Sequence, residues 1–147
     1  MELECTGGER IGVSEPGMQV IPLSIVPAPR QWRVLVVEDE PMIAFSLEQM
    51  LIEEGFAIAG VAGDLPEALT IIESDVCEVA ILDANLAGVN SGPAAVALTA
   101  RGVPFIVMSG YSSDQYGSDF FGDAPRLQKP CQEDRIIQAL RSILPAS

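Results

Sequence analysis

An apolar run that ends on a carboxylate constrains this chain more than any other feature: residues 79–82 (Val-Ala-Ile-Leu) lead directly into Asp83. The run shows no alternation of apolar and polar residues, which predicts a strand buried on both faces, as in the parallel sheets of α/β domains. Asp83 then lies at the carboxyl end of this strand. In open α/β sheets, ligands bind at that edge, near the point where the strand order reverses.

Other apolar runs alternate with amphipathic segments before and after this strand. Strands are expected at residues 33–37, 57–62, 79–82, 104–108 and 126–128. Helices are expected from Pro41 to about Glu54, from Asp64 onward, over 93–101 and over 132–144. Five strands that alternate with helices imply an α/β fold with a parallel sheet, right-handed crossovers and helices on both faces.

The helical spacing of apolar residues predicts which side chains face the core. The expected inward residues are Ile43, Leu47, Met50 and Leu51 in the first helix, Ala68, Leu69 and Ile72 in the second, and Ile136, Leu140, Ile143 and Leu144 in the last. Residues 112–123 include Gly117 and Gly122, each of which costs a helix about 1 kcal/mol relative to Ala. Any helix in that stretch is therefore expected to be short.

Charge and hydropathy exclude several classes of protein. The net charge of −13, from 21 acidic and eight basic residues, argues against direct binding of nucleic acid, which requires clustered Lys and Arg. The apolar runs are too short to span a bilayer, so we expect no membrane insertion. The chain contains no His, which excludes Ser-His and Cys-His nucleophile pairs and His-based metal sites.

The length of 147 residues is enough for one domain with a core of its own. Residues 1–31 contain Gly, Pro and Ser at short intervals and no sustained periodicity, so we expect a mobile N-terminal tail followed by a domain over residues 32–147. Three cysteines without paired spacing and an acidic N-terminus indicate a cytoplasmic protein.

Polar residues follow four of the predicted strands. Glu38 and Asp39 come after the first strand, Asp83 after the third, Ser109 after the fourth, and Lys129, the only lysine of the chain, after the fifth. Carboxylates within about 4–5 Å of one another repel by roughly 4 kcal/mol per pair at an effective dielectric constant near 20, so they need cations or protons. A hard divalent ion with oxygen ligands suits such a cluster, which predicts a Mg²⁺ site.

An aspartate beside Mg²⁺ and a lysine is suited to attack phosphorus as a nucleophile. The metal and Lys129 would then balance the charge on the transferring phosphoryl oxygens, and the Ser109 hydroxyl would donate one further hydrogen bond. Each part also has a simpler interpretation. Acidic residues favour the start of a helix, and Asp83 and Ser109 are typical turn residues. The combination of all these residues at strand ends favours the phosphoryl site.

These residues together resemble the receiver domain of bacterial two-component response regulators, over residues 33–144. The resemblance implies a flavodoxin-like, doubly wound sheet of order 2-1-3-4-5, with Asp83 as the phosphoacceptor and Ser109 and Lys129 as contacts of the phosphoryl group. It also implies that Glu38, Asp39, Asp83 and the backbone carbonyl of Asn85 hold Mg²⁺. The implied phosphodonor is a sensor histidine kinase or a phosphotransfer protein. Because Ser109 and Lys129 flank residues 110–128, we expect phosphorylation to change that surface, which a downstream protein partner then recognises.

More narrowly, the residues Asp83 to Leu86 and the Ser109-Gly110-Tyr111 triplet resemble single-domain receivers of alphaproteobacteria that are named for a Phe-Ala-Thr-Gly-x-Tyr motif. That subgroup is paired with the HWE class of histidine kinases. The chain departs from the motif at residues 107–109 (Val-Met-Ser), and Arg126 stands where receivers usually have a Tyr or Phe. Only three residues follow Leu144, so a single-domain regulator is expected.

Two other functions share parts of this pattern. A Mg²⁺-dependent phosphatase-like enzyme with an aspartyl-phosphate intermediate needs an acid two residues after the nucleophile, where this chain has Asn85. A flavin-binding module of similar topology needs a phosphate-binding loop after the first strand. Residues 38–40 are Glu-Asp-Glu there, and they would repel an anionic phosphate.

Overall fold

The computed structural model describes residues 30–110 and 121–145 of the chain. The predicted tail lies almost entirely outside these residues, as does most of the 112–123 stretch. The division into a tail and a domain therefore stays a prediction. Within the described residues, no helix is both long and apolar enough to cross a membrane.

The described residues form seven strands and four helices. In chain order these are β1 (Arg33–Val37), α1 (Pro41–Glu53), β2 (Ala57–Ala62), α2 (Leu65–Glu73), β3 (Val79–Asp83), β4 (Asn85–Leu86), β5 (Val89–Asn90), α3 (Gly92–Ala100), β6 (Phe105–Ser109), β7 (Arg126–Gln128) and α4 (Glu133–Ile143).

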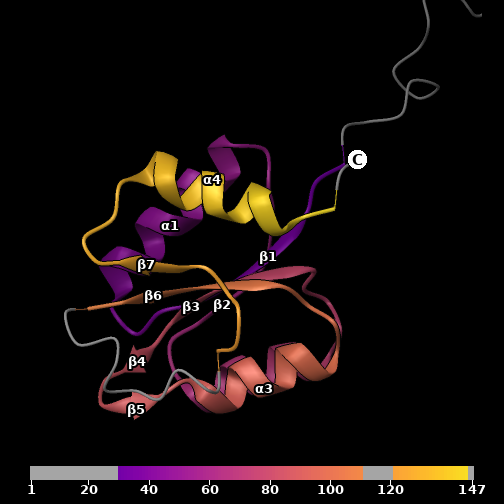
Figure 1. Ribbon diagram of the computed structural model, residues 1–147, viewed down its shortest axis with the longest axis vertical. Coiled ribbons are helices and arrows are strands. Elements are labelled where there is room, and N and C mark those ends of the chain that lie inside the picture. The colour runs from indigo at the N-terminus through magenta and orange to yellow at the C-terminus, as the bar shows by residue number, and fades with distance from the viewer. Residues whose placement is uncertain (1–29, 111–120, 146–147) are drawn as a thin grey trace, which may run out of the picture. The chain divides into compact units, whose positions relative to one another are not determined.

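Five of the strands form one parallel sheet in the order β2-β1-β3-β6-β7. Once the short strands β4 and β5 are set aside, this is the predicted order 2-1-3-4-5, and the prediction of a doubly wound α/β fold is confirmed. Helices α1 and α4 cover one face of the sheet, and α3 lies on the other (Figure 1). The strand order therefore reverses between β1 and β3, the strands that lead to the acidic residues.

Two apolar clusters fill the space between the sheet and its helices. One joins the sheet to α2 and α3, and the other joins it to α1 and α4. β3 is buried along its whole length, as expected for a central strand with no alternation. Local signals set the helix ends: Pro41 begins α1, and the Asp64 carboxylate caps α2 by accepting a hydrogen bond from the Glu67 amide at 2.9 Å.

The predicted core of α1 is wrong at one position. Ile43 is 37% exposed, whereas the neighbouring Ala44 is buried together with Leu47, Met50 and Leu51. The apolar spacing fitted either residue, and the smaller side chain is the one that faces the sheet. In α2, Ala68 and Ile72 are buried as predicted, but Leu69 is only half-buried.

The chain after Asp83 forms a two-stranded hairpin, which the sequence did not predict. β4 and β5 pair in antiparallel fashion, with Asn85 opposite Asn90 and Leu86 opposite Val89. The turn residues Ala87 and Gly88 have φ angles of 52° and 91°, as in the tight turns that match the twist of a hairpin. A non-glycine residue in this conformation is uncommon, which explains why the sequence did not predict the turn.

Candidate functional site

The parallel register brings four strand ends to one edge of the sheet. Val37 pairs with Leu82, Asp83 pairs with Met108, and Ser109 pairs with Gln128. The polar residues predicted at the strand ends therefore follow backbone positions that lie side by side. The sheet thus brings the strand ends together, as the alternation of strands and helices predicts.

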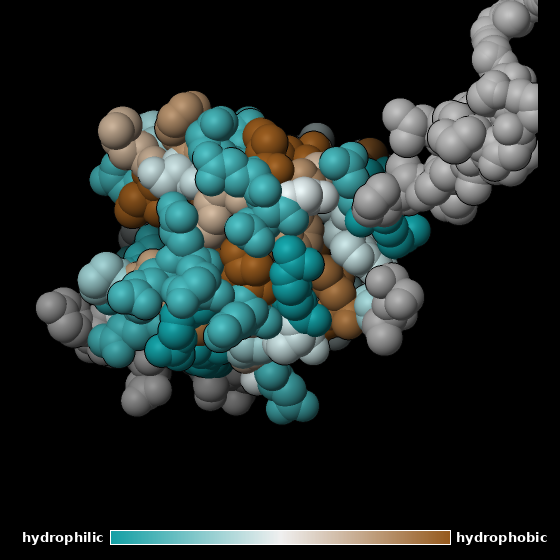
Figure 2. Space-filling view, turned by 90° about the horizontal axis from the view of Figure 1, so that it is seen from above, coloured by the Kyte–Doolittle hydropathy of each residue, from teal (hydrophilic) through white to brown (hydrophobic). Residues whose placement is uncertain are grey.

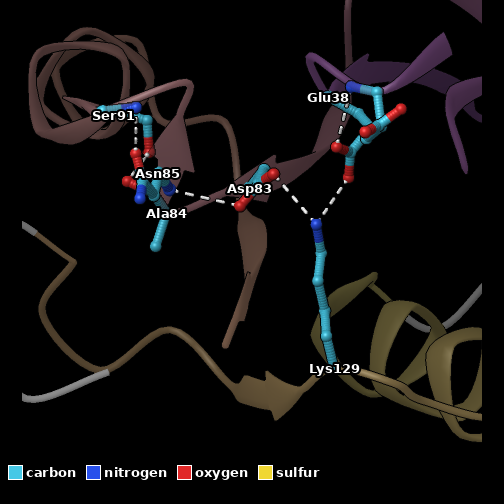
Figure 3. Close-up of polar contacts among 8 residues, drawn as sticks. Glu38, Asp83, Ala84, Asn85, Ser91 and Lys129 are labelled. Atoms are coloured by element: carbon cyan, nitrogen blue, oxygen red, sulfur yellow. Dashed lines mark hydrogen bonds and ion pairs between the residues drawn. The ribbon is translucent and has the colours of Figure 1, made fainter. Parts of the chain in front are cut away.

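Lys129 links the two buried carboxylates of this edge. Its Nζ donates hydrogen bonds to Glu38 Oε1 and to Asp83 Oδ2, each at 2.9 Å (Figure 3). Glu38 and Asp83 are only 3% and 6% exposed. The backbone amide of Lys129 also donates to the Ser109 carbonyl at 2.7 Å, which fixes the start of the lysine side chain beside the end of β6.

Backbone amides hold the other oxygen of each carboxylate. The Glu40 amide donates to Glu38 Oε2 at 3.1 Å, and the Asn85 amide donates to Asp83 Oδ1 at 3.1 Å. Each carboxylate is therefore held from two sides, by a side-chain ammonium and by a backbone N–H. Such contacts restrict rotation of the two side chains.

Asp39 completes a cluster of three acids. Carboxylate oxygens of Glu38, Asp39 and Asp83 all lie within 4.8 Å of one another. At that separation each pair repels by about 3–4 kcal/mol at an effective dielectric constant near 20. Lys129 compensates only one of the three negative charges. An all-oxygen donor set with surplus negative charge is what Mg²⁺ prefers, so the residues present fit this ion.

Burial controls the protonation of the acid at the centre of the site. It raises the pKa of Asp83 from its ordinary value to about 6, against the lowering effect of the Lys129 hydrogen bond and with a further increase from the Glu38 charge. Burial alone would lower the pKa of Lys129, but its hydrogen bonds to Glu38 and Asp83 outweigh that effect and raise it. At neutral pH, Asp83 is therefore mainly ionised and Lys129 is charged.

The remaining predicted residues lie at the same edge. Ser109 is the last residue of β6 and is buried, and Asn85 begins β4 directly beside Asp83. Arg126 lies on β7, where its guanidinium carbon is 5.2 Å from the centre of the Phe121 ring.

An apolar cavity that the sequence did not indicate lies next to Lys129. It has a volume of about 580 Å³ and lies between α1, α4 and the end of β6. Its apolar lining includes Met42, Leu47, Met50, Met108, Cys131 and Ile136. On α1, Met42, Phe45 and Ile52 are 76%, 59% and 51% exposed. Seen from the side of α1 and α4, hydrophobic residues lie among hydrophilic ones (Figure 2).

A family model, the response regulator receiver domain, matches residues 34–141. The chain therefore belongs to the receiver domain family of two-component response regulators, and the predicted family is confirmed. Receiver domains bind Mg²⁺ at an acidic pocket and are phosphorylated by histidine kinases or phosphotransfer proteins. This chain has an acidic cluster of Glu38, Asp39 and Asp83.

Several known proteins are similar to this chain. The solution structure of SdrG from Sphingomonas melonis is 40% identical, covers 78% of this chain and 98% of SdrG, and has a TM-score of 0.68. The receiver domain of PhyR from Erythrobacter litoralis is 28% identical, with coverages of 80% and 96% and a TM-score of 0.65. The transcriptional regulatory protein PdtaR of Mycobacterium tuberculosis is 35% identical over 81 residues, which is 54% of this chain and 40% of PdtaR. The chain thus matches less than half the length of that relative.

Proposed function

We propose that this receiver domain accepts a phosphoryl group on Asp83 from a histidine kinase or a phosphotransfer protein in the cytoplasm, with Mg²⁺ held by Glu38, Asp39, Asp83 and the backbone carbonyl of Asn85. One observation carries the proposal: the buried Asp83 carboxylate shares the single lysine of the chain with a second acid, Glu38, inside a three-acid cluster. That arrangement places the nucleophile, Asp83, beside Lys129, a cation that can compensate the negative charge of the phosphorylated aspartate.

The transfer forms a bond between an Asp83 carboxylate oxygen and phosphorus, and it breaks the bond between phosphorus and the imidazole nitrogen of the donor. The electron pair of the broken bond stays on the imidazole. No base is required, because Asp83 is mainly ionised at neutral pH. Lys129 and the Ser109 hydroxyl would contact the phosphoryl oxygens, and Mg²⁺ when bound supplies further charge compensation there.

The apolar surface of α1 supports a protein as the donor. The cavity between α1 and α4 is lined by Lys129, whose ammonium contacts Asp83, so a helix seated on this surface brings its phosphohistidine close to the acceptor. A neighbouring groove is lined by Glu53, Glu54, Glu133 and Asp134. A donor helix with an apolar stripe and basic flanking residues would complement both surfaces. Whether the donor is an HWE-type kinase stays a prediction.

The output would leave through the chain that connects the two phosphoryl contacts. Ser109 ends β6 and Lys129 follows β7, so a movement of either residue toward a phosphoryl oxygen is transmitted to the ends of the 110–128 segment. A downstream protein partner would recognise that change. A phosphatase-like enzyme is disfavoured, since Asn85 occupies the position where a second acid is needed.

Labelling with a small acyl phosphate and Mg²⁺ tests the proposal. The wild type should gain one phosphoryl group by intact-mass measurement, and Asp83→Asn should gain none. Asp123→Asn, at an exposed aspartate outside the cluster, serves as the control and should be labelled like the wild type. Equal labelling of the wild type and Asp83→Asn would contradict the proposal.

A further inference from the structure

Ser91 is a fully buried polar residue between β5 and α3 that the proposed reaction does not use. It stands at the N-cap position of α3, where a serine hydroxyl normally accepts a hydrogen bond from the first turn, yet it makes no side-chain cap bond. Its Oγ instead donates to the Ala84 carbonyl at 3.3 Å, and its backbone amide donates to the same carbonyl at 3.0 Å (Figure 3).

The Ala84 carbonyl belongs to the peptide group that contacts the phosphoacceptor. This peptide group also contains the Asn85 N–H, which donates to Asp83 Oδ1 at 3.1 Å. Because a peptide group is planar, fixing its carbonyl also fixes the direction of its N–H. The two bonds from Ser91 therefore orient the donor that holds Asp83, and they anchor the backbone immediately before the Asn85 carbonyl.

Two asparagines complete the hydrogen bonding of the hairpin. Asn90 Oδ1 accepts from the Gly92 amide at 2.6 Å, and the Ala94 amide, which an N-cap hydroxyl could bind, donates to the Ser91 carbonyl at 2.9 Å. Asn85 Oδ1 accepts from the Gly88 amide at 2.7 Å and closes the turn. The Ser91 hydroxyl is therefore not needed as a cap of α3, and it donates to the Ala84 carbonyl.

We infer that Ser91 is a positioning residue for the Mg²⁺ site: its hydroxyl fixes the peptide group between Ala84 and Asn85, so that the Asn85 carbonyl and the Asp83 carboxylate face the cation together. This inference rests on the proposed function. It extends that function to a residue that touches neither the cation nor the phosphoryl group.

Two titrations of the full chain test the inference: direct Mg²⁺ binding, measured by calorimetry without a phosphodonor, and the Mg²⁺ dependence of acyl phosphate labelling. In Ser91→Ala the backbone amide of residue 91 still donates to the Ala84 carbonyl, so only one of the two hydrogen bonds that orient this peptide group is lost. We expect the Mg²⁺ dissociation constant and the Mg²⁺ concentration for half-maximal labelling to rise together by about threefold to tenfold, at or below the lower limit for residues that orient metal ligands. The labelling rate at saturating Mg²⁺ should stay within about twofold of the wild type, because Asp83 and Lys129 are unchanged.

Ser91→Cys provides a second variant of similar shape with a weaker donor, and it carries the test if the alanine variant does not fold. Its Mg²⁺ requirement should fall between those of the wild type and Ser91→Ala. Asp39→Asn, which removes a carboxylate of the cluster, should raise the requirement more than either. Ser74→Ala removes a hydroxyl that donates to the Ile71 carbonyl at the end of α2, so it should leave the requirement unchanged.

The outcomes separate this inference from the proposed function. Wild-type labelling that depends on Mg²⁺, together with an unchanged Mg²⁺ requirement in the Ser91 variants, would overturn the inference alone. A slower rate at saturating Mg²⁺ with an unchanged requirement would also overturn it. Labelling of the wild type that is independent of Mg²⁺ and equal in Asp83→Asn would instead overturn the proposed function.

Discussion

Asp83 shows how its surroundings determine the chemistry of one side chain. Buried at the end of β3, it keeps one oxygen on the Asn85 amide and the other on Lys129. Burial raises its pKa to about 6, so folding without a cation makes the carboxylate harder to ionise. The position that suits a nucleophile therefore lowers the stability of the metal-free protein at neutral pH.

The destabilising effect of ionising the buried Asp83 carboxylate should appear in the pH dependence of stability. The folded pKa of Asp83 lies above its ordinary value of 3.8, so the folded protein retains a proton that the unfolded chain has released. The stability associated with that proton is present below about pH 4 and is lost as the pH rises through about 6. Asp83→Asn cannot ionise. The variant should therefore be more stable relative to the wild type at pH 7.5 than at pH 4: the difference in free energy of unfolding, variant minus wild type, should rise by on the order of 2 kcal/mol.

Urea unfolding in EDTA at the two pH values measures this difference. Asp123→Asn, at an exposed position, is the matched control and should change by well under 1 kcal/mol between them. If Asp83→Asn shows the same relative stability at both pH values, burial does not govern the Asp83 carboxylate.

At the scale of the elements, α1 has two different faces. Its inner face packs Ala44, Leu47, Met50 and Leu51 against the sheet, and its outer face exposes Met42, Phe45 and Ile52. The sequence alone did not separate these faces, because apolar residues occur all around the helix and their spacing allows more than one inward stripe. The exposed residues lie on the element that borders the cavity next to Lys129.

Replacing one exposed residue of α1 should separate docking from chemistry. Phe45→Gln should leave stability within about 0.5 kcal/mol of the wild type and acyl phosphate labelling unchanged, because Phe45 is 59% exposed. Transfer from a phosphorylated kinase or phosphotransfer protein should slow by about tenfold, as expected when a buried aromatic anchor of an interface is lost.

Val96→Gln is the matched control for this prediction. Val96 is 51% exposed on α3, on the opposite face of the sheet, and its substitution should not alter protein-to-protein transfer. Equal effects of the two variants would show that the donor does not dock on α1.

At the scale of the whole molecule, the order of the sheet and the convergence of the acidic residues were predictable. Both follow from buried strands that alternate with helices, since parallel strands end at a common edge. The β4–β5 hairpin was not predictable, because Ala87 adopts a positive φ that its residue type does not favour. The role of Ser91 was hidden as well, since a serine before a helix normally indicates a cap and not a contact with a distant carbonyl.

The most direct test of the account locates the phosphoryl group itself. After labelling with acyl phosphate and Mg²⁺, borohydride reduces an aspartyl phosphate to homoserine, and peptide mass spectrometry identifies the converted residue. If Asp83 is the phosphoacceptor, homoserine is expected at position 83 after labelling with Mg²⁺, and none is expected there when EDTA replaces Mg²⁺. Conversion at Glu38 or Asp39 in place of Asp83, or conversion at Asp83 that does not depend on Mg²⁺, would contradict it.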